Sequence, residues 1–100
     1  MKIHFEPEAQ TELNEAAAWY GRRREGLGAD LIAAVGEALE KIAESPFRHS
    51  RLETLPDEPN VRRVLLRRFP YAVVYEIASD EIRVVAVSHT GRRPNYWLDR

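Results

Sequence analysis

The sequence predicts an α+β domain in which an antiparallel helical hairpin packs on one face of an antiparallel sheet. Apolar residues recur at helical spacing in two consecutive segments, 7–25 and 28–44. Three shorter segments rich in Val, Ile, Tyr and Leu follow, at 61–68, 71–78 and 81–89. The chain has 100 residues, of which 44% are hydrophobic and 31% charged, so we expect one globular domain over its whole length.

The N-terminal part is expected to form a strand and then a helix. Residues 2–6 alternate, with Ile3 and Phe5 on one face, which predicts a short strand that joins the sheet. Pro7 suits the first position of a helix because its missing N–H would have no partner there. The helix is then predicted over about residues 7–25 from an apolar stripe made of Ala9, Leu13, Ala16, Ala17 and Tyr20.

A second helix follows after a glycine-containing break at Gly26 and Gly28. Its apolar stripe consists of Leu31, Val35, Leu39 and Ile42. Ser45-Pro46 ends it. The break is so short that the two helices are expected to form an antiparallel hairpin. Residues 45–60 hold three prolines and no clear period, which predicts a surface loop.

The three later segments predict a C-terminal three-stranded antiparallel meander. We expect Phe69-Pro70 and Ser79-Asp80 to form two-residue turns, which fixes the strand register. Glu76 then lies between two arginines, one on each neighbouring strand, and Arg67 lies opposite Ala72. The two arginines are Arg63 and Arg83. The tail after the last strand is expected to be a short helix or an extended strap.

This register assigns the side chains of the meander to two faces. The face expected to pack on the hairpin carries Val64, Leu66, Val73, Tyr75, Ile77, Ile82, Val84 and Ala86. The opposite face carries Arg63, Arg67, Glu76, Arg83 and His89 among Leu65, Val74, Val85 and Val87. Because the second face is mixed and basic, it is the candidate for an open functional surface.

The charge is distributed unevenly along a chain whose net charge is only −1. From Asn60 onward there are eight arginines and four acidic residues, and thirteen of the fifteen basic residues in the chain are arginine. Arg makes planar, bidentate contacts with carboxylates and phosphates. The C-terminal half is therefore suited to a nucleic acid or an acidic protein surface, although a general bias toward arginine would give the same composition.

Several classes of site and location are not expected. The chain has no cysteine, which excludes disulfides and thiolate sites, and its three scattered histidines show no metal-ligand spacing, so we expect no metal and no cofactor. No stretch reaches the roughly 18–20 apolar residues of a membrane span, and the N-terminus has no run of signal-peptide length. We expect a cytoplasmic protein.

The order of these elements resembles the RelE/ParE superfamily of bacterial toxins from type II toxin–antitoxin pairs. The resemblance is carried by VRRVLLRRFPYAVVYEI at 61–77 and IRVVAVSHTGRRPNYW at 82–97, and the FPY turn and H-x-x-R-R-P ending are typical of the ParE-like branch. It implies a toxin, in some cases a plasmid-stabilising one, that a cognate antitoxin holds inactive. Oligomers are expected only through that complex or as a weak dimer.

The superfamily contains two activities. ParE-like members bind and poison DNA gyrase without being nucleases, whereas RelE-like members enter the ribosome and cleave mRNA. In RelE-like enzymes a catalytic arginine often follows the first aromatic residue of a Tyr-Arg-x-x-Tyr strand, and here that position is Ala72. This residue and the low net charge favour the ParE-like activity, since ribosome binders of the family are usually strongly basic. A member kept only for its antitoxin complex is a third possibility.

Each interpretation has its own candidate residues. The ParE-like one places target binding in the tail, at Arg92, Arg93, Tyr96 and Trp97, and antitoxin binding at Arg63, Arg83, Leu31 and Val35. The mRNA endonuclease, with ribosome and mRNA as partners, would use Arg67, His89, Arg93 and Tyr96. For His89 the simpler interpretation is a hydrogen-bonded histidine at a strand end, and for Tyr96 and Trp97 it is a tail fastened to the core.

Overall fold

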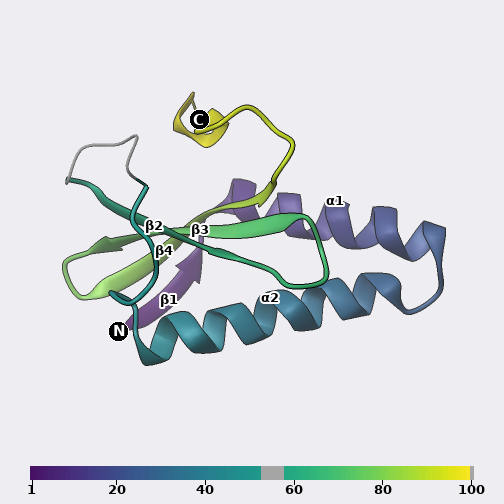
Figure 1. Cartoon of the computed structure of the whole chain (residues 1–100), viewed down its shortest axis with the longest axis horizontal. Helices are drawn as coiled ribbons and strands as arrows, with labels where there is room; N and C mark the ends of the chain where they lie inside the picture. The colour runs from purple at the N-terminus through teal and green to yellow at the C-terminus, as the bar shows by residue number, and fades with distance from the viewer. Residues whose placement is uncertain (53–57, 100) are drawn as a thin grey trace.

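The computed structural model describes residues 1–52 and 58–99 of the chain. Its elements, in chain order, are β1 (Lys2–Phe5), α1 (Pro7–Arg23), α2 (Leu27–Glu44), β2 (Asn60–Leu65), β3 (Tyr71–Ala78), β4 (Glu81–His89) and the 3₁₀ turn η1 (Tyr96–Asp99). Figure 1 shows the two helices side by side as a hairpin, packed along the sheet, with the C-terminal tail rising on the other side. The α+β class is confirmed.

The four strands form one mixed sheet in the order β1-β4-β3-β2. Strands β2, β3 and β4 are the predicted antiparallel meander, but β1 pairs with β4 in parallel, from Lys2 opposite Glu81 to Phe5 opposite Val84. The expectation of a wholly antiparallel sheet is therefore wrong at this edge. The helical hairpin separates β1 from the meander, and such a long crossover permits parallel pairing where a tight turn would not.

The hairpin requires glycine at its turn and at its crossing point. Helix α1 ends at Arg23, two residues earlier than predicted, and Gly26 at the start of α2 has a φ of 85°, which favours glycine. A Cβ on Gly28 would lie 2.3 Å from the carbonyl oxygen of Ala17. The helices thus approach closely at their joined end.

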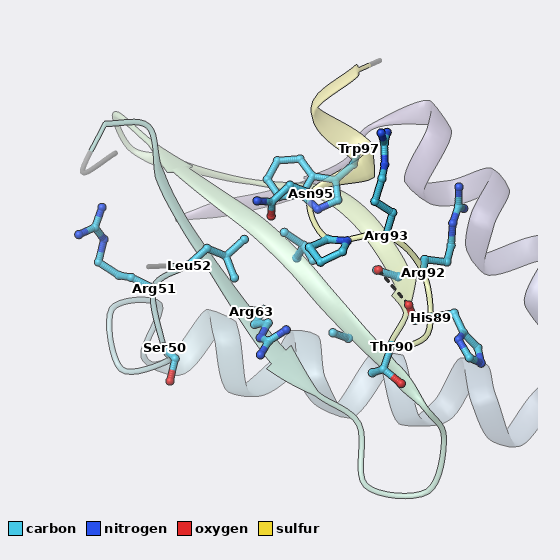
Figure 2. Close-up of a pocket in the computed structure, with 14 residues that line it drawn as sticks. Ser50, Arg51, Leu52, Arg63, His89, Thr90, Arg92, Arg93, Asn95 and Trp97 are labelled. Carbon is cyan, nitrogen blue, oxygen red and sulfur yellow. Dashed lines mark hydrogen bonds between the residues drawn. The ribbon is translucent and has the colours of Figure 1, made fainter. Parts of the chain in front are cut away.

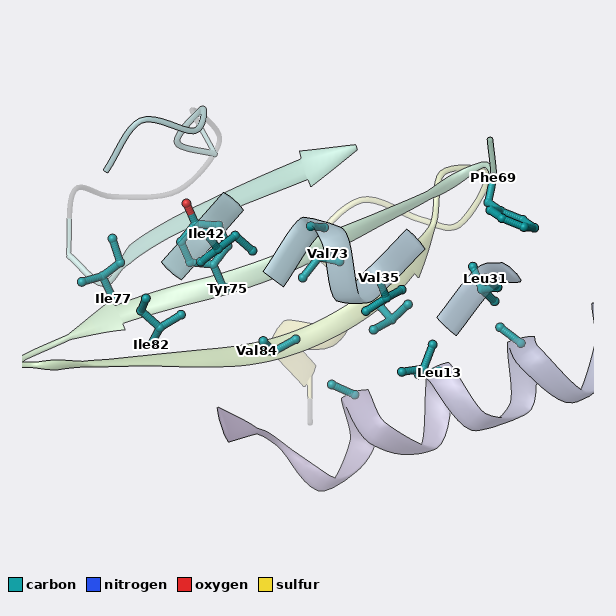
Figure 3. Close-up of a cluster of buried hydrophobic side chains, with 14 residues drawn as sticks. Leu13, Leu31, Val35, Ile42, Phe69, Val73, Tyr75, Ile77, Ile82 and Val84 are labelled. Carbon is teal, nitrogen blue, oxygen red and sulfur yellow. The ribbon is translucent and has the colours of Figure 1, made fainter. Parts of the chain in front are cut away.

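The core lies between the hairpin and the inner face of the sheet (Figure 3). Tyr75 is fully buried at its centre and donates a hydrogen bond from its hydroxyl to the Pro46 carbonyl oxygen, at 2.6 Å. The other labelled core side chains come from both helices, the strands and the β2–β3 loop: Leu13, Leu31, Val35, Ile42, Phe69, Val73, Ile77, Ile82 and Val84.

The connection between β2 and β3 is longer than predicted. Residues 66–70 form a five-residue loop in place of the two-residue turn, so that Arg63 lies opposite Val74 and not opposite Glu76. Phe69 causes the difference, because its ring is buried and packs edge-on against Tyr20, with ring centroids 5.0 Å apart. The predicted Arg63–Glu76–Arg83 row is therefore wrong.

The same shift changes the neighbours of Ala72. Its partner on β2 is Leu65, whereas Arg67 lies beyond the strand in the loop. The pairing of Glu76 with Arg83 on β4 is confirmed. A displacement of two residues keeps every β2 side chain on its predicted face, since side chains alternate with a period of two.

A β-bulge in β4 changes faces as well as neighbours. Val74 pairs with Ala86 and Tyr75 pairs with Val84, so Val85 is an extra residue. After the bulge, Val87 joins the hairpin-facing core and Ala86 joins a small cluster on the outer face, the reverse of the prediction. His89 turns with Val87 to the hairpin side.

Candidate functional site

The tail after β4 folds back over the outer face of the sheet and encloses a cavity of about 420 Å³. We call this cavity the tail pocket. Its walls are residues 50–52, Arg63 of β2, Ala72 and Val74 of β3, residues 88–90 and 92–95, and Trp97. Figure 2 shows Trp97 and Arg93 on the tail side and Arg63 on the sheet side of this space. This is the outer face of the sheet, which was expected from the sequence to be an open surface, and the tail covers part of it.

The tail pocket is basic. Four arginines from three separate parts of the chain line it, and among its described lining residues there is no Asp or Glu. The arginines are Arg51, Arg63, Arg92 and Arg93. Guanidinium groups bind carboxylates and phosphates through charge-assisted hydrogen bonds. The pocket is therefore suited to an acidic segment or a phosphate-bearing partner.

Glu12 of α1 fastens the tail. Its carboxylate accepts a hydrogen bond from the Tyr96 hydroxyl and another, at 3.0 Å, from the backbone N–H of Val87. Arg92 lies 3.5 Å from the same carboxylate, and its guanidinium lies 3.6 Å from the centre of the Tyr96 ring. The Glu12 side chain is only 15% exposed. One carboxylate thus joins the helix, the bulged strand and the tail.

The environment of Tyr96 shows that it has a structural role. The side chain is buried, and burial raises the pKa of its phenol, as does its hydrogen bond to Glu12. Tyr96 does not line the tail pocket, although its neighbour Trp97 does. Trp97 packs against an outer-face cluster that includes Val74 and Ala86. The tail is therefore held at two points, by the hydrogen bond from Tyr96 to Glu12 of α1 and by the packing of Trp97 on the outer face of the sheet.

Arg62 holds the start of the loop that lines the pocket. Its guanidinium donates to the carbonyl oxygens of Phe47 and His49, at 2.8 and 2.7 Å. The hydroxyl of Tyr75 holds the Pro46 carbonyl beside them. Arg62 is thus a framework residue, whereas its neighbour Arg63 faces the cavity.

The structure does not bring together the four residues expected for a nuclease. Arg93 lines the tail pocket, but Tyr96 is tied to Glu12 outside it. Arg67 lines a different cavity, between the β2–β3 loop and α2. His89 lies at the edge of the tail pocket (Figure 2). Its ring packs edge-on against Tyr71, with ring centroids 5.1 Å apart. Its Nδ1 accepts a hydrogen bond from the Gly91 N–H.

The residues expected to bind the antitoxin are dispersed. Leu31 and Val35 are 0% and 1% exposed in the hairpin–sheet core, so neither side chain offers a contact surface in this conformation. Arg63 lies in the tail pocket. Arg83 forms ion pairs with Glu6 and Glu81, at 3.5 and 3.7 Å.

Sequence reasoning missed Glu12, although a signal was present. It lies three residues after Ala9 and four before Ala16, so it falls on the apolar stripe of the first helix. A carboxylate on the apolar stripe of a helix indicates that a hydrogen-bond donor lies beside it inside the protein. The partner is the Val87 N–H, which the short strand β1 leaves unpaired because β1 reaches only to Val84.

The described part of the chain holds neither a metal-binding cluster nor a membrane-spanning helix. Among the described residues, no three His, Asp or Glu side chains lie close enough to hold a metal ion. In that same part of the chain, neither helix is long and apolar enough to cross a membrane.

Comparison with known proteins agrees with this architecture. Residues 3–94 match the family described as ParE toxin of type II toxin-antitoxin system, parDE. None of the curated protein sequences matches the chain. A solved structure described as the chromosomal ParDE TA system from P. aeruginosa is similar, with a TM-score of 0.64 and 17% identity. The similarity covers 89% of this chain and 95% of that one, which confirms the fold. The chain belongs to the ParE toxin family.

Proposed function

We propose that this protein is a non-catalytic toxin that binds DNA gyrase in the cytoplasm and is neutralised by a cognate antitoxin. Membership of the ParE family supports the toxin part of the proposal. The observation that favours binding over catalysis is the dispersal of the expected nuclease groups: Ala72 lies in the wall of the tail pocket, Arg67 lies outside it, and Tyr96 is tied to Glu12.

In this proposal the tail pocket provides the target contacts. Arg93 and Trp97 lie on the same side of the cavity, and both residue types often anchor protein interfaces. Arg93 is exposed, so its side chain is accessible to a partner. A few such anchors usually carry most of the binding energy, so single substitutions here should reduce toxicity.

A growth-arrest assay tests the activity. The protein is expressed from an inducible promoter, and incorporation of labelled thymidine and leucine is followed over time. We expect DNA synthesis to fall before protein synthesis, with cellular mRNA intact. Early loss of protein synthesis together with cleaved mRNA would support the RelE-like endonuclease and contradict the proposal.

Variants locate the activity. Arg93→Ala should weaken growth arrest, whereas Arg22→Ala, a matched change at the exposed end of α1, should not. His89→Gln should retain toxicity because no proton transfer is required. Circular dichroism checks that each variant is folded. Loss of toxicity in folded His89→Gln would contradict a non-catalytic mechanism, since removing a proton-transfer group typically costs about 10²–10⁴ in rate.

Neutralisation is tested separately with the product of the adjacent small gene. A partner that binds only the native state raises its apparent stability. Co-purification and a higher melting temperature of the complex are expected. Failure of the two proteins to form a complex would contradict the antitoxin part of the proposal.

A further inference from the structure

A second cavity, of about 370 Å³, lies on the hairpin side of His89. We call it the aromatic pocket. Four rings line it, those of Trp19, Tyr20, Tyr71 and His89. Each ring contacts the next edge-on in the order Trp19, Tyr20, Tyr71, His89. The centroids of successive rings are 5.0, 6.2 and 5.1 Å apart. Neither target binding nor the fastening of the tail uses this row of rings.

The charged groups of the aromatic pocket are mainly acidic. Glu12, Glu15 and Arg92 line it, and Arg92 pairs with Glu12. Glu15 is exposed, and within residues 1–52 and 58–99 it has no hydrogen-bond or ion-pair partner. The pocket therefore retains one carboxylate for a ligand. Burial raises the pKa of Tyr71, and the neighbouring Tyr20 and Glu12 add to the increase.

Two contacts at and beside the aromatic pocket show that aromatic rings and carboxylates in this region attract guanidinium groups. The Arg23 guanidinium lies 4.4 Å from the centre of the Trp19 ring. The Arg92 guanidinium lies over the Tyr96 ring and also forms an ion pair with the Glu12 carboxylate. An aromatic ring beside a carboxylate binds a planar guanidinium well, because the cation attracts the ring face while its N–H groups meet the oxygens.

We propose that the aromatic pocket binds an arginine side chain presented by a peptide segment of a partner protein. The Glu15 carboxylate would accept hydrogen bonds from the guanidinium N–H groups, and the Trp19 and Tyr71 rings would lie beside the planar guanidinium group. The tail pocket, with four arginines, has the opposite preference. The protein would therefore recognise acidic and basic groups at two adjacent sites, and this inference holds whether or not gyrase is the target.

The test measures binding of two short peptides to the purified full chain. Acetyl-Gly-Arg-Gly-amide is the probe, and the citrulline analogue, which has nearly the same shape but no charge, is its control. Binding is followed by NMR through the indole N–H of Trp19 and the backbone amide of Ala16. We expect the arginine peptide to bind about fivefold or more tightly than the citrulline peptide, from a cation–π contact and an exposed ion pair.

Two variants locate the binding site. Glu15→Gln should remove about half or more of the preference for arginine, whereas Glu40→Gln, on the exposed surface of α2, should leave it unchanged. Both positions are exposed, so both variants should fold. The proposal would be overturned if the two peptides bound with equal affinity or if the two variants had equal effects. It would also be overturned if the signals of Trp19 and Ala16 did not shift, or if the shifts were confined to Trp97 of the tail pocket.

Discussion

Removing the Glu12 carboxylate should release the tail and weaken the whole fold. Glu12→Ala deletes the acceptor for the Tyr96 hydroxyl and for the Val87 N–H, both in a partly buried setting. A hydrogen bond to a charged group contributes about 1.5–3 kcal/mol. The Arg92 pair adds little, because the Arg92 side chain is 53% exposed. We therefore expect a loss of about 3–5 kcal/mol.

This loss is large for a domain of this size. Small proteins are stable by about 5–15 kcal/mol, and 1 kcal/mol lowers the melting temperature of a 60–100-residue domain by about 4–8 °C. Glu12→Ala should lower it by at least about 12 °C. Glu15→Ala, one turn away on the exposed surface of α1, should change the stability by no more than about 0.5 kcal/mol.

A double-mutant cycle isolates the contact with the tail. Tyr96→Phe keeps the ring and removes the hydroxyl that donates to Glu12. Urea unfolding of the parent, the two single variants and the double variant gives the coupling energy, which we expect to be about 1–2 kcal/mol. Additive effects, or a Glu12→Ala variant no less stable than Glu15→Ala, would refute the view that this carboxylate fastens the tail.

Three further predictions concern the scaffold. Gly28→Ala should destabilise the protein by about 1–3 kcal/mol because its Cβ would lie 2.3 Å from a backbone oxygen of α1, whereas Gly36→Ala, with nothing within 4 Å, should stabilise it by up to about 1 kcal/mol in thermal melts. Burial raises the pKa of Tyr75 to about 12, so the folded state favours the protonated phenol. The free energy of unfolding should therefore be unaffected by this group below pH 10 and should fall by as much as roughly 3 kcal/mol as the pH rises toward 12. Tyr75→Phe should show a weaker alkaline loss in urea titrations at several pH values. Arg62→Met should cost about 2–4 kcal/mol in urea unfolding, because two loop carbonyls lose a charged donor, and an unchanged midpoint would contradict this.

The sequence predicted the elements well because their signals are local. The stripes of the helices, Pro7 at a helix start and the turn at Ser79-Asp80 all act within a few residues, and each element lies where expected to within a few residues. Features set by distant contacts were not predictable. The β2–β3 loop is long because Phe69 enters the core beside Tyr20 of α1, a contact that no local pattern encodes.

The candidate site also depends on contacts between distant parts of the chain, so the sequence predicted only part of its arrangement. The tail arginines and Trp97 line one cavity with Arg63, although the sequence predicted target binding at the tail residues and antitoxin binding at Arg63. The bulge at Val85 could not be predicted from alternation, because an uninterrupted run of apolar residues fits either face. It turns His89 away from the outer face and exposes the Val87 N–H to Glu12, which determines how the tail is held.

A reaction with purified components tests most directly whether the protein binds gyrase through the tail pocket. Relaxed plasmid, gyrase and ATP are incubated with the parent protein, Arg93→Ala or Arg22→Ala, and supercoiled and cleaved DNA are measured on gels. We predict that the parent and Arg22→Ala inhibit supercoiling and trap cleaved DNA, and that Arg93→Ala does so at least about fivefold less well. Normal supercoiling at saturating toxin, together with cleavage of ribosome-bound mRNA by the same preparation, would contradict the account.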